Sequence, residues 1–386
     1  MSGTTTVSSP VEAVRLADPY PYYARLVAER PFARDEALGA WVAADAAAVR
    51  AVLGSGALRV RPVAEPVPAG IAGTPAGEVF GELVRMTDGA PAARLKAVVA
   101  GALARADTAY AAALAARLTR EVLAAGGEVP YEELMFGIPA RVVADLSGLT
   151  EGAGREAARA IGDFVQCIPA GATEDQYAAA SAAATRLRAL LSPALAEARA
   201  TPAGAPNPAG GQGLLRELVA AAEREGWAHL GPLLSNAIGF LSQTYDATAG
   251  LIGNTLVALA RGADGADTRA LVREVVRYDA PIQNTRRFAA EAFTYGGSTV
   301  EPGQQVLVLL AAANRDPAVN PDPHTLSLGR VNPAVFTFGA AAHRCPGAEL
   351  ATALAGAVVA ELRAAGLGTT ATPAYRPLAN ARIPLL

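Results

Sequence analysis

The stretch FTFGAAAHRCPGAEL, residues 336–350, decides how the rest of the sequence is interpreted. It holds Cys345, one of two cysteines in the chain, in a glycine-containing segment directly before an alanine-rich stretch with helical spacing. Backbone N–H groups of a turn and the N-terminus of a following helix both stabilise a negatively charged sulfur. Gly339 and Gly347 allow backbone conformations closed to other residues and a close approach to a flat ligand. The stretch is therefore compatible with a thiolate that binds a ligand.

The residues of this stretch alone leave simpler interpretations of the cysteine open. A lone cysteine is more often a small buried apolar side chain than a ligand. A tetrahedral metal site is less favoured, because the three histidines and two cysteines are scattered without ligand spacing. Cys167 and Cys345 could form at most one disulfide, which a reducing compartment disfavours.

The composition of the whole chain indicates a globular protein without a strongly charged partner. The 386 residues are 52% hydrophobic, and 33 basic against 36 acidic residues give a formal charge of −3. We therefore expect neither nucleic acid nor a membrane as a partner. The first ten residues resemble no leader sequence, and no apolar run approaches the roughly 20 residues that span a bilayer. We expect a soluble, cytoplasmic protein with a disordered N-terminus over residues 1–10.

Hydrophobic periodicity predicts a mainly α protein with small β-sheets, of the α+β class. Short strands are predicted at Ala40–Ala43, Phe293–Tyr295 and Val306–Leu310. The predicted helices cover about 43–54, 91–105, 107–125, 137–148, 176–199, 213–224, 230–261, 266–279 and 347–365.

Three motifs, taken in order, resemble the cytochromes P450. The pattern Phe-Gly-x-x-x-His-x-Cys-x-Gly over residues 338–347 is similar to the haem-binding loop of that family. Upstream, EVVR over residues 274–277 looks like its ExxR motif, whose acidic and basic side chains lie one helical turn apart and can pair. Between them, ANRDP over residues 313–317 and the spacing to Arg330 resemble the approach to the family's meander. The resemblance covers most of the chain.

The resemblance implies a triangular, single-domain P450 fold over residues 11–386. It implies haem b, iron protoporphyrin IX, between a distal helix and the cysteine loop with its following helix. Cys345 would be the thiolate ligand of the haem iron. Phe338, Gly339 and Gly347 match the loop that carries this ligand.

The resemblance also implies roles for several charged side chains. His343 and Arg287 match positions that contact the haem propionates, where a cation pairs with a carboxylate. Two family residues of the helix over 91–105 are replaced, because Ala92 stands at the usual histidine and Lys96 at the usual arginine. Haem anchoring would then depend on His343, Arg287 and Lys96. A structural ion network behind the haem is implied for Glu274, Arg277 and Arg330.

The long helix predicted over 230–261 departs most from the family. It resembles the P450 helix whose acid and alcohol relay protons during oxygen activation. Asp246 falls on the acid, but Ala247 stands at the alcohol position and Thr248 follows it. Burying a carboxylate is costly unless it is paired or solvated, so Asp246 is either functional or ion-paired. Ala341 is a second departure, at the second glycine of the family's loop.

The missing hydroxyl leaves three interpretations open, because proton transfer needs a donor within about 3 Å or one bridging water. The substrate supplies the hydroxyl; Thr248, Thr244 or ordered water replaces it; or the oxidant is peroxide or an N–O or O–O bond of the substrate. Polar and apolar residues near the site are predicted to line the substrate pocket, with packing as the alternative: Gln243, Ile282, Gln283 and Asn284.

The resemblance therefore implies an enzyme, a cytochrome P450 oxidoreductase and monooxygenase. It would oxidise a small-molecule intermediate of secondary-metabolite biosynthesis, with electrons from an external ferredoxin and ferredoxin reductase. The first alternative is a haem-thiolate enzyme of group transfer, cyclisation or coupling that uses peroxide or a substrate-borne oxidant. The remote alternative is a non-catalytic haem sensor.

Overall fold

The computed structural model of the protein describes residues 9–169, 171–201, 213–263 and 266–386. These residues form two compact units, each assembled from separate stretches of chain. Unit 1 holds residues up to 63 together with 253–345 and 368–386, and unit 2 holds 64–252 and 346–367. A single catalytic domain over residues 11–386 stays a prediction.

The predicted disordered N-terminus overlaps the described chain only at its last two residues. Residues 1–8 of that segment lie outside the described residues. Helix α1 (Pro10–Ala13) begins directly after Ser9, whose hydroxyl accepts a hydrogen bond from the Val11 N–H at 3.2 Å. For Ser9 and Pro10 the expected disorder is not observed, because a side-chain cap and a proline in the first turn start a helix there.

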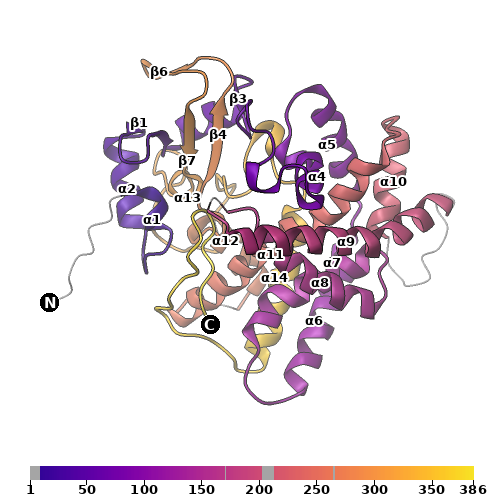
Figure 1. Ribbon diagram of the computed structural model, residues 1–386. Helices are drawn as coiled ribbons and strands as arrows, with labels where there is room; N and C mark the ends of the chain where they lie inside the picture. Colours follow the sequence, from indigo (N-terminus) through magenta and orange to yellow (C-terminus); the bar gives the residue numbers. More distant parts are fainter. Residues whose placement is uncertain (1–8, 170, 202–212, 264–265) are drawn as a thin grey trace. The chain divides into compact units, whose positions relative to one another are not determined.

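Unit 1 is built on a five-stranded sheet with the order β1-β2-β7-β4-β3 (Figure 1). Its strands are β1 (Phe32–Asp35), β2 (Ala40–Ala43), β3 (Leu58–Arg59), β4 (Thr285–Ala289) and β7 (Gln305–Val308). Strands β2 and β7 pair in parallel, whereas the other neighbours are antiparallel. A separate hairpin joins β5 (Phe293–Tyr295) to β6 (Ser298–Val300).

The centre of this sheet is apolar on both faces. Along β7, Val306 and Val308 belong to one buried cluster, and Leu307 between them belongs to another. Successive side chains of a strand point to opposite faces, so an unbroken apolar run indicates that both faces are covered. The helices that lie wholly within unit 1 are α1, α2 (Tyr20–Glu29), α3 (Ala46–Gly54), α12 (Thr268–Tyr278), α13 (Leu310–Asn314) and the short turn η4 (Ala341–His343).

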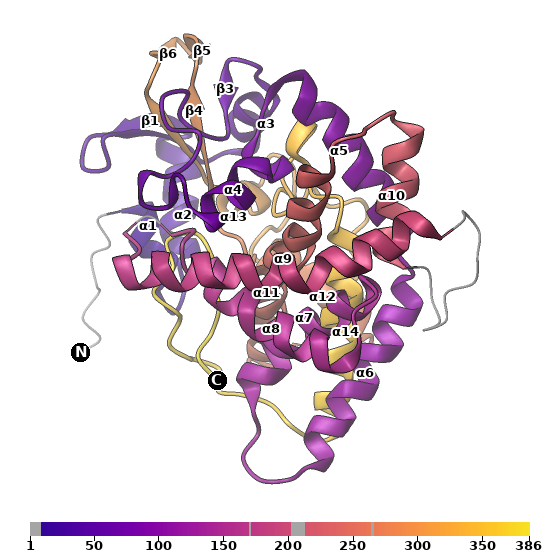
Figure 2. The ribbon, with the colours of Figure 1, turned by 45° about the vertical axis from the view of Figure 1, so that its right-hand side comes forward.

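Unit 2 is helical. Helix α6 lies beside α14, α5 beside α10, and α8 between α7 and α9 (Figure 2). The long helix α11 passes from unit 2 into unit 1 after residue 252. The elements are η1 (Ala69–Ile71), α4 (Pro75–Glu82), η2 (Val84–Met86), α5 (Gly89–Leu103), α6 (Thr108–Ala124), the π-turn η3 (Glu133–Gly137), α7 (Ile138–Leu146), α8 (Glu151–Val165), α9 (Glu174–Ala200), α10 (Leu214–Arg224), α11 (Leu230–Ala260) and α14 (Ala348–Ala364).

The predicted class, mainly α with small sheets, is confirmed, and each predicted helical segment contains a helix. The predicted strand Val306–Leu310 ends two residues early, because Leu310 begins α13. Within the described residues, no single helix is long and apolar enough to cross a membrane. Only α5 and α6 taken together, as a pair bent by 65°, reach that length and apolarity.

Candidate functional site

Cys345 is an exposed residue on a closed turn. The Gly339 N–H donates to the Phe336 carbonyl at 2.7 Å, and the Cys345 N–H donates to the Phe338 carbonyl at 2.7 Å. Cys345 is exposed, whereas Cys167 is buried. Burial raises the pKa of the Cys167 thiol to about 11. The description of a small buried apolar cysteine therefore fits Cys167, and Cys345 is the thiol accessible to a ligand.

Two residues of this turn adopt left-handed backbone conformations. Gly339 has a φ of +70°, and a Cβ built on it would lie 3.1 Å from the His343 carbonyl oxygen. Ala341, which stands where the family's loop has a glycine, has a φ of +51°. Gly347 has a φ of −92°, which any residue can adopt. The expected need for a special backbone conformation therefore holds at Gly339 and is wrong at Gly347.

We predict opposite effects of exchanging glycine and alanine at the two left-handed positions. Gly339→Ala should destabilise the folded protein by about 1–2 kcal/mol, the cost of a side chain in this conformation, with the tight carbonyl contact added. Ala341→Gly should be neutral or stabilise it by up to about 1 kcal/mol, because relief of the same strain is partly offset by a more flexible unfolded chain. Urea unfolding of both variants measures this difference, and Gly356→Ala in α14 is the control. Equal effects at the two positions would contradict it.

The cationic side chains expected near a haem are divided between the two units. In unit 1, Arg287 is only 5% exposed, and its Nη1 donates to the Arg286 carbonyl at 2.8 Å. His343 ends the turn η4 and is half-buried. In unit 2, the half-buried Lys96 lies one turn after Ala92 on α5, and Gly347 precedes α14.

This donor set fits a thiolate-bound haem. Unit 1 combines an accessible sulfur with a buried guanidinium and a half-buried imidazole, which are groups suited to an iron and to carboxylates. Cys345 would bind the iron, and His343 and Arg287 would bind the propionates. Phe338 and Gly339 form the turn that holds the cysteine.

Glu274, Arg277 and Arg330 lie in direct contact in unit 1. The Arg277 guanidinium, fully buried, donates to both carboxylate oxygens of Glu274 at 2.6 and 3.0 Å, and Arg330 Nε donates to Oε1 at 3.1 Å. Arg277 also donates to the carbonyls of Pro323 and Thr325 at 2.8 and 3.1 Å. The network joins α12 to the chain before the cysteine turn, which is a scaffold role.

The residues predicted to line the substrate pocket at the entry to β4 have packing contacts. Gln283 is fully buried, and its amide donates to the Ala280 carbonyl at 2.7 Å. Asn284 donates to the Ala379 carbonyl at 2.8 Å, and Ile282 forms an isolated bridge with Ala381. The amide oxygens of Gln283 and Asn284 are buried and accept no hydrogen bond from the described residues. Their contact with a substrate stays a prediction.

The polar island of α11 lies in unit 2. Gln243 is exposed, and Asp246 and Ala247 are half-buried at positions three and four residues later, so the three lie on one face of the helix. The Thr244 hydroxyl donates to the Phe240 carbonyl at 2.7 Å. Thr248 is fully buried, and its hydroxyl makes no hydrogen bond to the described residues. Thr248, directly after Ala247, therefore carries a hydroxyl group that is not used in a hydrogen bond to the described residues.

Sequence reasoning missed a second buried ion pair in unit 1. Arg382, fully buried, donates through Nε to Asp279 Oδ1 at 2.9 Å, and its other nitrogens donate to backbone carbonyls of residues 14, 16 and 17. The two residues are separated by 103 positions. The only local signal was a carboxylate directly after the ExxR helix.

These features define a mainly helical protein with an exposed cysteine on a closed turn. A family model described as "Cytochrome P450" matches residues 268–362. The chain is 29% identical over 228 residues to "Putative cytochrome P450 133B2" of Xylella fastidiosa (strain 9a5c), covering 57% of this chain and 55% of that relative. It is 31% identical over 229 residues to "Vitamin D(3) 25-hydroxylase" of Pseudonocardia autotrophica, covering 57% and 53%.

A solved structure matches the chain over nearly its whole length. "Crystal Structure of CalO2" superposes with a TM-score of 0.81 at 26% identity, covering 97% of this chain and 96% of that chain. The chain spans about half the length of the two curated relatives in their alignments. The protein belongs to the cytochrome P450 family.

Proposed function

We propose that this protein is a haem-thiolate monooxygenase that oxidises a small molecule with O₂ and external reductant. The observation that carries the proposal is the accessible thiol of Cys345 on a turn closed by the Cys345 N–H bond to Phe338. When bound, a thiolate-ligated haem supplies the redox chemistry that activates oxygen. The similarity to a relative named as a hydroxylase supports the same reaction class.

The substrate is a hydroxyl-bearing intermediate of secondary metabolism, and its own hydroxyl replaces the one missing at Ala247. Gln243, Asp246 and Ala247 share one partly exposed face of α11, and a small methyl group there leaves room for a polar substrate group beside the Asp246 carboxylate. Gln243 is held along this face, because its amide donates to the Gly239 carbonyl at 3.1 Å. Its side-chain oxygen is then available to accept from a substrate.

Thr248 is the second candidate for the relay. Its buried, unbonded hydroxyl favours it over Thr244, whose hydroxyl is committed to the Phe240 carbonyl. Helical spacing places Thr248 about 100° around the helix from Ala247, so it reaches the same proton path only through a water. Asp246 and Ala247 are therefore the positions proposed to determine proton delivery, and Thr248 is the alternative donor.

We predict that Ala247→Thr lowers the product formed per reductant consumed, by about twofold to tenfold. The reason is that the new side chain occupies the space of the substrate hydroxyl, while a positioned proton donor contributes ~10²–10⁴-fold in rate. Thr248→Val should leave this ratio unchanged. The measurement is product and reductant consumption with a ferredoxin, its reductase and a hydroxylated substrate that shifts the haem spectrum. A higher ratio of product to consumed reductant in Ala247→Thr, together with a lower ratio in Thr248→Val, would assign the relay to Thr248.

The electron donor and the oxidant are tested with the same assembled system. The proposal requires an external ferredoxin and ferredoxin reductase, and product that depends on both O₂ and reductant. Product formed with peroxide alone, or without oxygen, would replace it by the peroxide or substrate-borne oxidant alternative. Ligand binding with no product under any of these conditions would favour the haem sensor.

A further inference from the structure

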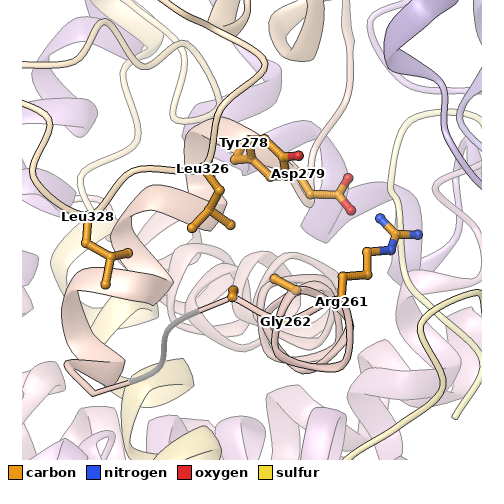
Figure 3. Close-up of a pocket in the computed structure, with 8 residues that line it drawn as sticks. Arg261, Gly262, Tyr278, Asp279, Leu326 and Leu328 are labelled. Carbon is orange, nitrogen blue, oxygen red and sulfur yellow. The ribbon is translucent and has the colours of Figure 1, made fainter.

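Unit 1 contains a pocket of about 470 Å³ whose lining includes none of the residues assigned to haem binding. Its walls include Arg261 and Gly262 at the end of α11, Tyr278 and Asp279 at the end of α12, and Leu326 and Leu328 (Figure 3). Small-molecule sites occupy about 300–1,000 Å³, are mostly apolar, and carry a few placed polar groups. The volume of this pocket lies within that range.

Asp279 supplies a recessed acceptor to this pocket. The residue is 3% exposed, and its Oδ1 accepts from the Tyr20 hydroxyl at 3.1 Å and from Arg382 Nε at 2.9 Å. Its Oδ2 accepts no hydrogen bond from any residue in the described parts of the chain. The carboxylate is largely shielded from water, so a further donor from a bound molecule would stabilise its charge.

Arg261 supplies a cation to the same pocket. Its Nε donates to the Ala371 carbonyl at 2.7 Å and its Nη2 to the Ala17 carbonyl at 3.3 Å, which holds the guanidinium in place. The charged ends of Arg261 and Asp279 point toward one another in Figure 3. Arg261 forms no ion pair with Asp279 in the described structure.

We propose that this pocket binds a small zwitterion, an α-amino acid with an apolar side chain. Its ammonium group donates to Asp279 Oδ2, its carboxylate accepts from Arg261, and its side chain packs on Leu326 and Leu328. A simple cation would be repelled by the guanidinium groups of Arg261 and Arg382, and a simple anion would be repelled by the carboxylate of Asp279. A zwitterion satisfies both ends of the pocket and adds no net charge.

The test is calorimetric titration of the haem-loaded protein with L-leucine, L-leucinamide and N-acetyl-L-leucine. Saturable binding of L-leucine is expected, with at least about tenfold weaker binding of each blocked analogue, because each one lacks one of the two charges. Equal affinity for the three compounds, or no saturable binding of L-leucine, overturns the proposal.

A pair of matched variants locates the binding. Leu328→Trp fills the pocket and should abolish L-leucine binding, while its haem spectrum stays that of the parent. Val331→Trp is the control, because Val331 is 86% exposed in the same unit and lines no part of this pocket. Equal L-leucine affinity in the two variants refutes a site at this place, whatever substrate the enzyme oxidises.

Discussion

Cys345→Ala is expected to remove the thiolate-haem spectrum and to lower product formation by more than about a hundredfold. Loss of an outer partner of a metal ligand already costs about 10–100-fold, and this variant removes the ligand itself. Cys167→Ala is the control, because that thiol is buried and its sulfur contacts the Phe164 carbonyl at 3.1 Å. The measurement is the optical spectrum of the reduced protein with carbon monoxide. A thiolate-haem spectrum in Cys345→Ala would overturn the proposed ligand.

Thiol labelling gives an independent measurement of the same assignment. The thiolate is the reactive form, so a raised pKa protects a thiol and exposure makes it available. At pH 8 a thiol with the pKa of about 11 given by burial of Cys167 is ionised in only about one molecule in a thousand. The haem-free chain should therefore incorporate one equivalent of iodoacetamide, at Cys345, and haem should prevent this. Labelling of Cys345 that haem leaves unchanged would contradict iron binding there.

Glu274→Ala is expected to destabilise the folded protein by about 3–5 kcal/mol. Breaking a buried ion pair leaves an uncompensated charge, here the guanidinium of Arg277, whose side chain is 0% exposed. Glu274 also accepts from Arg330 and from the Ser327 N–H at 3.1 Å, so the chain before the cysteine turn loses its attachment as well. Urea unfolding followed by circular dichroism measures the change in free energy of unfolding.

Two comparison variants identify the cause of that loss. Glu121→Ala breaks the exposed Arg117–Glu121 pair of α6 and should cost less than about 1 kcal/mol. Glu274→Leu combined with Arg277→Met removes both buried charges, yet it should stay destabilised because the carbonyls of Pro323 and Thr325 lose their donor. A Glu274→Ala loss no larger than that of Glu121→Ala would show that the network does not stabilise the fold.

The helices missed by sequence reasoning show where local patterns fail. Helix α8 contains Gly152, Gly154 and Gly162, which lower helix propensity. A contact from elsewhere in the fold favours glycine at position 162, because a Cβ there would lie 2.8 Å from the Tyr245 hydroxyl oxygen. Apolar alternation alone also did not predict strand β4, which only the family resemblance implied. Arg286 and Arg287 interrupt its apolar pattern, and only pairing with β7 on one side and β3 on the other makes it a strand.

The sequence alone determined what depends on short separations along the chain. The 3.6-residue period predicted the helices, the three-residue spacing of Glu274 and Arg277 predicted their pairing, and the residues around Cys345 predicted the turn that carries it. Tertiary structure alone decided which cysteine is exposed and which polar groups keep an unsatisfied atom. Burial and long-range partners, such as the Arg382–Asp279 pair, depend on which distant segments meet, and no local period encodes that choice.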